Sequence, residues 1–240
     1  VGSEMCIRDS ISTAFDKDLS ELNAMVQKLG SLAITQFETA IDALATQHME
    51  TLDHVISNDA KLDELEAAIN EKAVEVIALR SPHARDLRQV LVALKIATIL
   101  ERTGDYARNI ANRTRVIAQA GNENIPGVNI GRMGQVAQEM LRDVMQAYDG
   151  HDAKLALEVW HRDIEVDHMH TAFYKEVLAS MARDPNFVAT GAHLLFMAKN
   201  IERIGDYATG IAEQVHFLVH GAVPEDSRPK ADRTSKVVGV

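Results

Sequence analysis

Residues 101–107 read Glu-Arg-Thr-Gly-Asp-Tyr-Ala, and residues 202–208 read Glu-Arg-Ile-Gly-Asp-Tyr-Ala. The similarity extends to both sides of this block. Residues 94–111 align with residues 195–212 at a constant offset of 101, with identity at 10 of 18 positions. Chance rarely produces such agreement, so the sequence predicts an internal duplication with one copy of the block in each half of the chain.

Three helical segments are predicted in each half, because apolar residues recur there at steps of three and four. In the first half they run from Phe15 to about Leu44, over about 50–79, and from Ser81-Pro82 to about Gln119; in the second half they cover about 130–148, 152–182 and 186–219. We therefore expect an all-α protein made of two tandem, pseudo-symmetric three-helix bundles, with six long antiparallel helices.

The expected domain boundary lies in a stretch rich in Gly and Asn at residues 120–127. The first bundle is assigned to residues 11–121 and the second to residues 122–221. A tail over residues 222–240 carries two prolines and mixed charge, and we expect it to be mobile.

Residues 1–10 are expected to be non-native. The run from Glu4 to Ser10 is what the DNA of a common transposon-based sequencing adapter would encode in one reading frame, so the authentic sequence is expected to begin near Ile11. The only cysteine, Cys6, falls within this run, and no function is assigned to it.

Composition excludes several classes of protein. The 240 residues carry a formal net charge of −10, which argues against a general nucleic-acid binder because such a protein needs a basic face. A single cysteine excludes an internal disulfide framework and a CxxC zinc site. The longest apolar stretch, Val90 to Leu100, is interrupted by Lys95 and is too short to span a bilayer. We expect a soluble protein of the cytoplasm.

Paired carboxylates recur at a spacing that places both on one helix face, one turn apart. The four pairs are Asp59/Asp63, Glu101/Asp105, Asp163/Asp167 and Glu202/Asp206. Their phase is informative, since Glu101 and Asp105 continue the apolar stripe formed by Leu87, Leu91 and Leu94. The acids are therefore predicted to lie on or beside the packing seam of each bundle.

Carboxylates at a packing seam are costly unless a counter-charge is present. Oxygen ligands suit Mg²⁺, Mn²⁺ or iron, whereas the absence of thiols disfavours a structural zinc site. The alternative is an exposed seam on which these acids form salt bridges with arginines, namely Arg85, Arg88, Arg102 and Arg203. Fourfold recurrence in one phase favours metal. Gly104 and Gly205, each inside a motif, indicate either close helix packing or access to a ligand.

Other candidate sites are weaker. Glu158 with His161, and Glu165 with His168, match the spacing of di-iron carboxylate proteins, but all four lie on one segment, which favours a surface coincidence. His161, His168 and His170 are candidates to assist metal binding near Asp163 and Asp167. The sequence contains no Walker loop, no GxGxxG, no zincin motif and no evident catalytic triad. A carboxylate-bridged metalloenzyme and a metal-free helical adaptor stay open as alternatives.

The doubled Glu-Arg-x-Gly-Asp-Tyr-Ala block closely resembles the PhoU family, together with Arg85-Asp86-Leu87-Arg88 and the opening Phe15-Asp16-x-Asp18-Leu19. The resemblance covers the chain from Ile11 to about Gly221. It implies a fold of two tandem three-helix bundles. It also implies that the four acidic pairs are metal motifs, associated in this family with multinuclear iron, zinc, or magnesium and manganese.

The same resemblance implies a regulatory function and no enzyme activity. A PhoU-like protein is expected to be a homodimer in the cytoplasm, peripheral to the membrane through its partners. Those partners are expected to be the phosphate ABC importer, with its ATPase and permease, and a sensor histidine kinase. The expected role is negative regulation of phosphate uptake and of the phosphate-starvation response. The halves depart from the family pattern after the motif, where the first ends in Asn112 and the second in Glu213.

Overall fold

The computed structural model describes residues 2–46, 50–119, 128–225, 228 and 230–237. Six α-helices and two short 3-10 helices, η1 and η2, account for the regular structure of these residues, and they contain no strand. The helices are α1 (Gly2–Thr46), α2 (Glu50–Arg80), α3 (Arg85–Gln119), α4 (Val128–Gly150), α5 (Ala153–Arg183), η1 (Pro185–Phe187), α6 (Val188–His220) and η2 (Thr234–Lys236). The predicted all-α class is confirmed.

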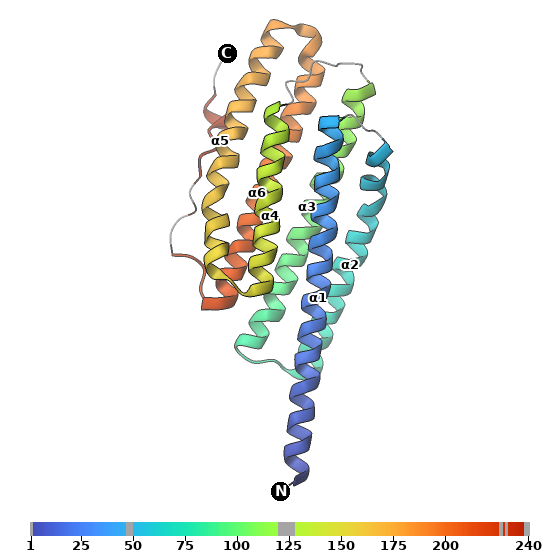
Figure 1. Ribbon diagram of the computed structural model, residues 1–240, viewed down its shortest axis with the longest axis vertical. Coiled ribbons are helices and arrows are strands. Elements are labelled where there is room, and N and C mark those ends of the chain that lie inside the picture. Colours follow the sequence, from blue (N-terminus) through green and yellow to red (C-terminus); the bar gives the residue numbers. More distant parts are fainter. Residues whose placement is uncertain (1, 47–49, 120–127, 226–227, 229, 238–240) are drawn as a thin grey trace.

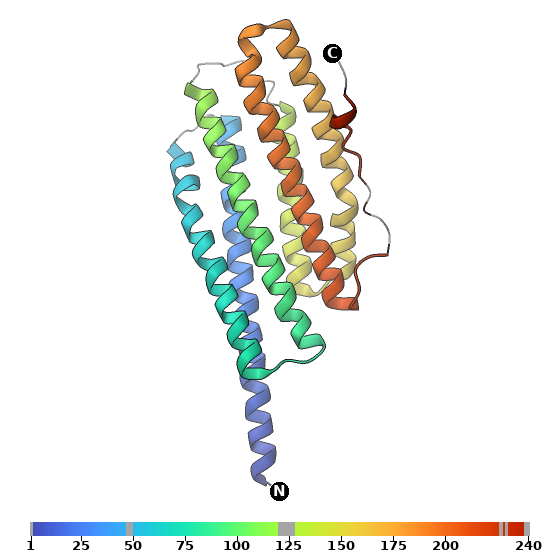
Figure 2. The same ribbon diagram turned by 180° about the vertical axis from the view of Figure 1, so that it is seen from behind.

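Each half forms a bundle of three helices that contact one another, α1 to α3 in the first and α4 to α6 in the second. The two bundles also pack together, through α3 against α6 and α1 against α4 (Figure 1). Figure 2 shows the result from behind, with α2, α3, α6 and α5 side by side in this order. The helices that carry the acidic pairs therefore form one continuous layer, with α1 and α4 on its other side.

Helix ends follow local sequence signals. Asp152 caps α5 by accepting 3.0 Å hydrogen bonds from the backbone N–H groups of Lys154 and Leu155. Gly221 ends α6 with a φ of +76°, a left-handed conformation that glycine adopts without strain. The start of α3 differs from the prediction. Pro82 lies in a connection in which Ser81 and Ala84 both have a φ of 47°, so the helix begins only at Arg85.

One apolar core runs through both bundles. Buried side chains from all six helices belong to a single cluster, which includes Phe37 in α1 and Phe173 in α5. The α1–α4 contact is close, since a Cβ at Gly134 would lie 2.8 Å from the Ile41 side chain. The predicted duplication therefore describes the order and arrangement of the helices. The two halves are stabilised by one common hydrophobic core, not by two separate cores.

The two ends of the chain and the linker can be compared with what the sequence led us to expect. Helix α1 begins at Gly2, so the segment that we expected to be non-native continues the helix, which extends beyond the ends of the other helices (Figure 1). The predicted boundary between residues 121 and 122 lies outside the described residues. The tail, which we expected to be mobile, has described residues that lie against α5 and α6, as detailed below.

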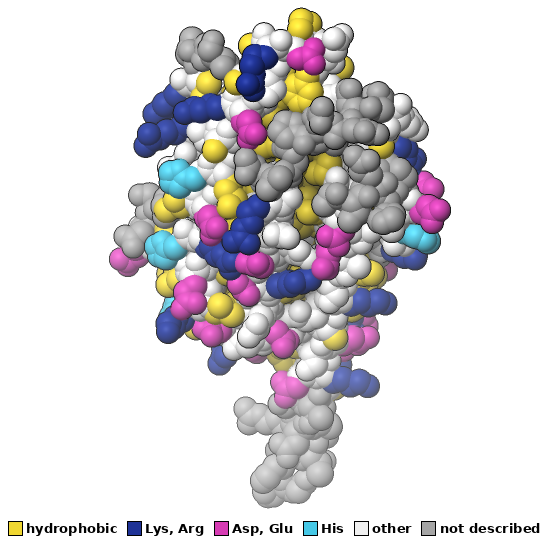
Figure 3. All heavy atoms as spheres, turned by 45° about the horizontal axis from the view of Figure 1, so that its top comes forward, with side chains coloured by type: hydrophobic (Ala, Val, Ile, Leu, Met, Phe, Trp, Pro, Cys, Tyr) yellow, Lys and Arg dark blue, Asp and Glu magenta, His cyan; other side chains and the backbone are white. Residues whose placement is uncertain are grey.

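On the surface shown in Figure 3, acidic and basic side chains are interspersed across the face that carries the upper ends of the helices. No helix within the described residues is both long and apolar enough to cross a membrane.

Replacing Gly104 by alanine is expected to lower the free energy of unfolding by about 1–2 kcal/mol. The added Cβ would lie 2.1 Å from Cδ1 of Leu62, which is fully buried in α2, and this overpacking outweighs the gain in helix propensity. Gly131→Ala is the matched control, because a Cβ there meets nothing within 4 Å, and it is expected to stabilise by about 0.5–1 kcal/mol. Urea unfolding of metal-free protein measures both. Equal shifts for the two variants would contradict the close α2–α3 packing.

Candidate metal centre

The first acidic cluster lies between α2 and α3. Arg108 donates hydrogen bonds to Asp59 of α2 and to Asp105 of α3, so the two acidic pairs of this half face each other. Glu66, one turn beyond Asp63, accepts a 2.9 Å hydrogen bond from the Thr98 hydroxyl of α3. The helical spacing aligns each pair, and the α2–α3 contact brings the pairs together.

Crowding of like charges is evident in the pKa values of this cluster. The pKa of Glu101 is raised above its usual range, first by burial and then by the charges of Asp105, Glu66 and Asp63. Burial and the charge of Asp63 raise the pKa of Asp105. A bound cation would relieve this repulsion, which is the property expected of a metal site built from carboxylates.

The second acidic cluster lies between α5 and α6 and is more deeply buried than the first. Asp163, Asp167 and Glu202 are each at most 4% exposed. Part of its counter-charge comes from outside the bundle, because Arg228 of the tail bonds to Asp163 at 2.5 Å and also to Asp206. The backbone N–H of Ala231 donates to Asp167 at 2.7 Å. The tail thus closes over this cluster.

The electrostatics of the second cluster combine burial with the charges of nearby basic side chains. Burial raises the pKa of Asp163 even though Arg228 acts in the opposite direction. The pKa of Glu202 is also raised, first by burial, although the ammonium of Lys199 lies 2.7 Å away. These carboxyls therefore retain a demand for positive charge that the protein side chains do not fully meet.

The donor set of the second cluster fits a metal ion. Asp163 Oδ1 is buried and has no hydrogen-bond partner among the described residues. It lies 3.0 Å from where a Cβ of Gly205 would stand, so the glycine leaves room for this oxygen. An orphaned carboxylate oxygen next to other carboxylates is a ready ligand for a hard cation. Gly104, by contrast, accommodates Leu62, which is close packing and not ligand access.

The structure places all eight predicted acids in these two clusters, on the helices that the sequence assigned to them. The arginines of the salt-bridge alternative are mostly elsewhere: Arg88 donates to the carbonyl of Phe217, and Arg203 donates to the Tyr106 hydroxyl at 2.7 Å. Lys199 contacts Glu202, and the arginines that contact the acids are Arg108 and Arg228. Sequence reasoning missed both, although Arg108 lies three residues after Asp105 on the same helix face.

The two clusters flank the contact between the bundles. The rings of Tyr106 and Tyr207, which follow Asp105 and Asp206 in the motif, stack with centroids 5.6 Å apart. Next to this stack, an open depression of about 470 Å³ leads to the second cluster. Its lining residues are Tyr106, Asp167, Lys199, Glu202, Arg203, Asp206, Tyr207, Lys230 and Asp232. Solvent ions therefore have access to the second cluster in spite of the tail.

Of the three candidate histidines, only His170 points into a cluster. His161 and His168 are exposed on α5, whereas His170 is 2% exposed and lies beside Asp232 of the tail. The tail residues Arg228 and Asp232 carried no signal in the sequence, since they follow α6 by several residues and match no motif.

Comparison with known proteins gives one consistent result. The family model for the PhoU domain matches residues 26–114 and 130–215, one match in each half. A phosphate-specific transport system accessory protein PhoU homolog of Caulobacter vibrioides is 41% identical over 223 residues, covering 93% of this chain and 97% of the relative. A protein of the same description from Rhizobium meliloti is 37% identical over 230 residues, covering 96% of this chain and 97% of the relative.

Solved structures agree. The crystal structure of PhoU from Pseudomonas aeruginosa matches with a TM-score of 0.84 at 30% identity, covering 87% of this chain and all of the other. The phosphate transport system regulatory protein PhoU from Streptococcus pneumoniae matches with a TM-score of 0.80 at 28% identity, covering 88% of this chain and 99% of the other.

Proposed function

The chain belongs to the PhoU family, and we propose that it is a metal-binding accessory protein that restrains phosphate uptake and the phosphate-starvation response. Its relatives are named accessory and regulatory proteins of phosphate transport, so this chain is a regulator and not an enzyme. The observation that carries the metal-binding proposal is the convergence of four acidic pairs into two clusters whose carboxyls repel one another.

In this proposal each cluster holds divalent cations. Asp59, Asp63, Glu101 and Asp105 would hold them in the first half, and Asp163, Asp167, Glu202 and Asp206 in the second. Magnesium, manganese, iron and zinc are the candidate metals, and several ions in one cluster are compatible with the number of carboxylates. A bound cation supplies positive charge that fixes the facing helices in one relative position.

The proposed regulatory role requires two binding partners. We propose that it binds the cytoplasmic face of the phosphate ABC importer and the sensor histidine kinase that reads phosphate supply. The layer of α2, α3, α6 and α5 is the candidate docking face, since the two acidic clusters and the Tyr106–Tyr207 stack lie on these four helices. Homodimer formation stays a prediction from the family.

A metal-free adaptor is the second candidate, because Arg108 and Arg228 each bridge two aspartates and so supply positive charge from the protein itself. It would fold, bind the same partners and regulate the same response. Metal content separates it from the first proposal.

Removing the carboxylates from one motif is expected to abolish metal binding in that half. The variants are Glu101→Gln with Asp105→Asn, and Glu202→Gln with Asp206→Asn, which keep side-chain size while removing charge. Elemental analysis of purified protein should show loss of the metal from the altered half, and a phosphate-starvation reporter should become active at ample phosphate.

The matched control changes Glu64 and Glu71 to glutamine, because both are exposed acids of α2 outside the cluster. It should retain metal and repression. Metal content that is unchanged in both motif variants would exclude these residues as ligands and favour the metal-free adaptor.

A further inference from the structure

The two acidic clusters are not chemically equivalent. Helices α2 and α5 align at an offset of 104, which pairs Asp59 with Asp163 and Asp63 with Asp167. The same offset pairs Glu66 with His170, so a carboxylate of the first cluster corresponds to an imidazole in the second. Both copies of the duplication therefore have the acidic pairs, while only the second has a nitrogen ligand at this position.

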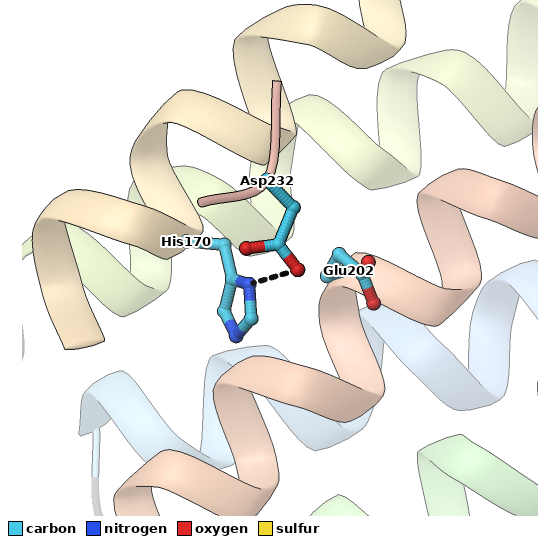
Figure 4. Close-up of side chains that lie close together, drawn as sticks. All are labelled: His170, Glu202 and Asp232. Atoms are coloured by element: carbon cyan, nitrogen blue, oxygen red, sulfur yellow. Dashed lines mark ion pairs between the residues drawn. The ribbon is translucent and has the colours of Figure 1, made fainter. Parts of the chain in front are cut away.

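His170 has the surroundings of a metal ligand. Its side chain is 2% exposed, and Nδ1 has no hydrogen-bond partner among the described residues. Nδ1 lies 3.6 Å from Asp232 Oδ2, which is too long for a hydrogen bond. Figure 4 shows this edge of the ring turned toward the Asp232 carboxylate, with Glu202 on the neighbouring helix α6. Burial lowers the pKa of His170 despite the charge of Asp232, and only the neutral ring coordinates a metal.

The three side chains are close enough to share one ion. One ligand atom each from His170, Glu202 and Asp232 lies within 4.8 Å of the other two. Ligand atoms around a tetrahedral zinc ion lie about 3.3 Å apart, so each separation has to shorten by at most about 1.5 Å for the three atoms to share one ion.

The charged side chain of Lys199 lies between Glu202 and Asp232, where the proposed ion would bind. The Lys199 ammonium lies 2.7 Å from Glu202 and 3.5 Å from Asp232. Its side chain is 42% exposed, so it can turn to solvent when another cation takes its place. The matching position of the first half is Thr98, a neutral donor to Glu66, so only the second cluster has an exchangeable cation of this kind.

We propose that His170, Glu202 and Asp232 bind a divalent cation of borderline softness, with Zn²⁺ as the representative, and that this ion ties the tail to the second bundle. Imidazole combined with carboxylates is a zinc donor set, whereas the first cluster offers the all-oxygen set that suits Mg²⁺ or Mn²⁺. The inference rests on the proposed function in one respect, since Glu202 also belongs to the second acidic cluster.

The ion would join elements that are otherwise held by few contacts. Asp232 lies just before η2, next to Ala231, whose N–H bonds to Asp167, and Arg233, whose N–H donates to the Thr171 hydroxyl at 3.1 Å. A metal ligated by α5, α6 and the tail fixes the tail beside the depression that leads to the second cluster. Zinc binding and tail position are thereby coupled, so either one strengthens the other.

The test titrates metal-free protein with Zn²⁺ and, separately, with Mn²⁺. His170→Ala and Asp232→Asn should each weaken zinc binding about tenfold or more while leaving manganese binding by the first cluster unchanged. His168→Ala and Glu225→Gln are the matched controls, because both residues are exposed and neither belongs to the group. His170→Gln should weaken zinc binding while keeping a side chain of similar size in the core, because an amide is a poor zinc ligand.

Limited proteolysis of the tail gives an independent readout. Zinc should slow cleavage of the tail in the unaltered protein and have no such effect in His170→Gln. Unchanged zinc affinity in His170→Ala, His170→Gln and Asp232→Asn would overturn the inference.

The inference and the proposed function fail in different ways. Loss of manganese in the Glu101/Asp105 variant together with intact zinc affinity in the His170 variants would overturn the inference and leave the proposed function standing. Zinc binding that depends on His170, Glu202 and Asp232, combined with unchanged manganese content in the Glu101→Gln/Asp105→Asn variant, would support the inference and contradict metal binding by the first cluster.

Discussion

In metal-free protein, Arg228→Ala is expected to lower the free energy of unfolding by about 3 kcal/mol. Asp163 is 1% exposed and Asp206 is partly buried, and both accept from this one guanidinium. Removing one partner from a buried ion pair leaves an uncompensated charge, whose cost is about 3–5 kcal/mol when burial is complete. Partial exposure of Arg228 and Asp206 places the expected value at the lower end. Urea unfolding in the presence of a chelator measures it.

Three comparisons make this result specific. Arg233→Ala changes an exposed arginine of the same tail and should have little effect. Adding Asp163→Asn to Arg228→Ala should recover part of the loss, because the stranded charge is then absent. Arg108→Ala should cost less, about 1–2 kcal/mol, since Asp105 is 40% exposed. Equal values for Arg228→Ala and Arg233→Ala would show that the tail does not neutralise the second cluster.

Divalent metal is expected to produce the largest change in stability. At a free concentration of Mn²⁺ about 100 times the dissociation constant, each occupied site adds about 2.7 kcal/mol, and two sites add about 5 kcal/mol. Thermal and urea unfolding with and without the metal provide the measurement. The Glu101→Gln/Asp105→Asn variant should show about half of the gain. A gain that is the same in this variant and in the unaltered protein would contradict binding by the first cluster.

The same experiment has a defined pH dependence. The pKa values of Glu101, Asp105, Asp163 and Glu202 are raised by folding, so their contribution to stability is fully present below their unfolded pKa of about 4 and is lost as pH rises through the folded values. Metal replaces the missing protons, so its stabilising effect should grow as pH rises above about 4, through the range in which these carboxyls ionise in the folded protein.

The pH dependence of stability that His170 contributes has the opposite sign. Its pKa is lowered in the folded state, so the unfolded chain binds more protons below about pH 6.5 and stability rises as pH increases through this range. His170→Ala should remove this rise and leave the carboxylate effect.

The acidic clusters show which parts of a site were open to prediction. Each pair could be located because a spacing of four residues fixes two carboxylates on one helix face, and because their phase matched that of the apolar stripe. The contacts of α2 with α3 and of α5 with α6, which the structure shows, bring two pairs together in each half. Arg108 was within reach of the same reasoning, since its distance from Asp105 along the helix is three residues.

The tail residues of the second cluster could not be predicted from local spacing. Arg228 and Asp232 lie in a segment with no helical period, and their partners Asp163 and His170 are more than 60 residues away in the chain. The sequence named His161, His168 and His170 together as possible helpers, and only burial in the folded protein separated His170 from the other two.

By itself, the sequence determined the all-α class, the duplication, the approximate ends of the helices, the family and the eight carboxylates, because all of these are encoded in local spacing or in a repeated motif. Only the tertiary structure decided that Gly104 packs against Leu62 while Gly205 lies beside the buried oxygen Oδ1 of Asp163, and that the tail supplies a cation and an acid to the second cluster. These features depend on contacts between helices and on the path of a non-periodic segment. Both the helix contacts and the path of this segment are set by the free energy of the whole fold, and no local sequence pattern encodes them.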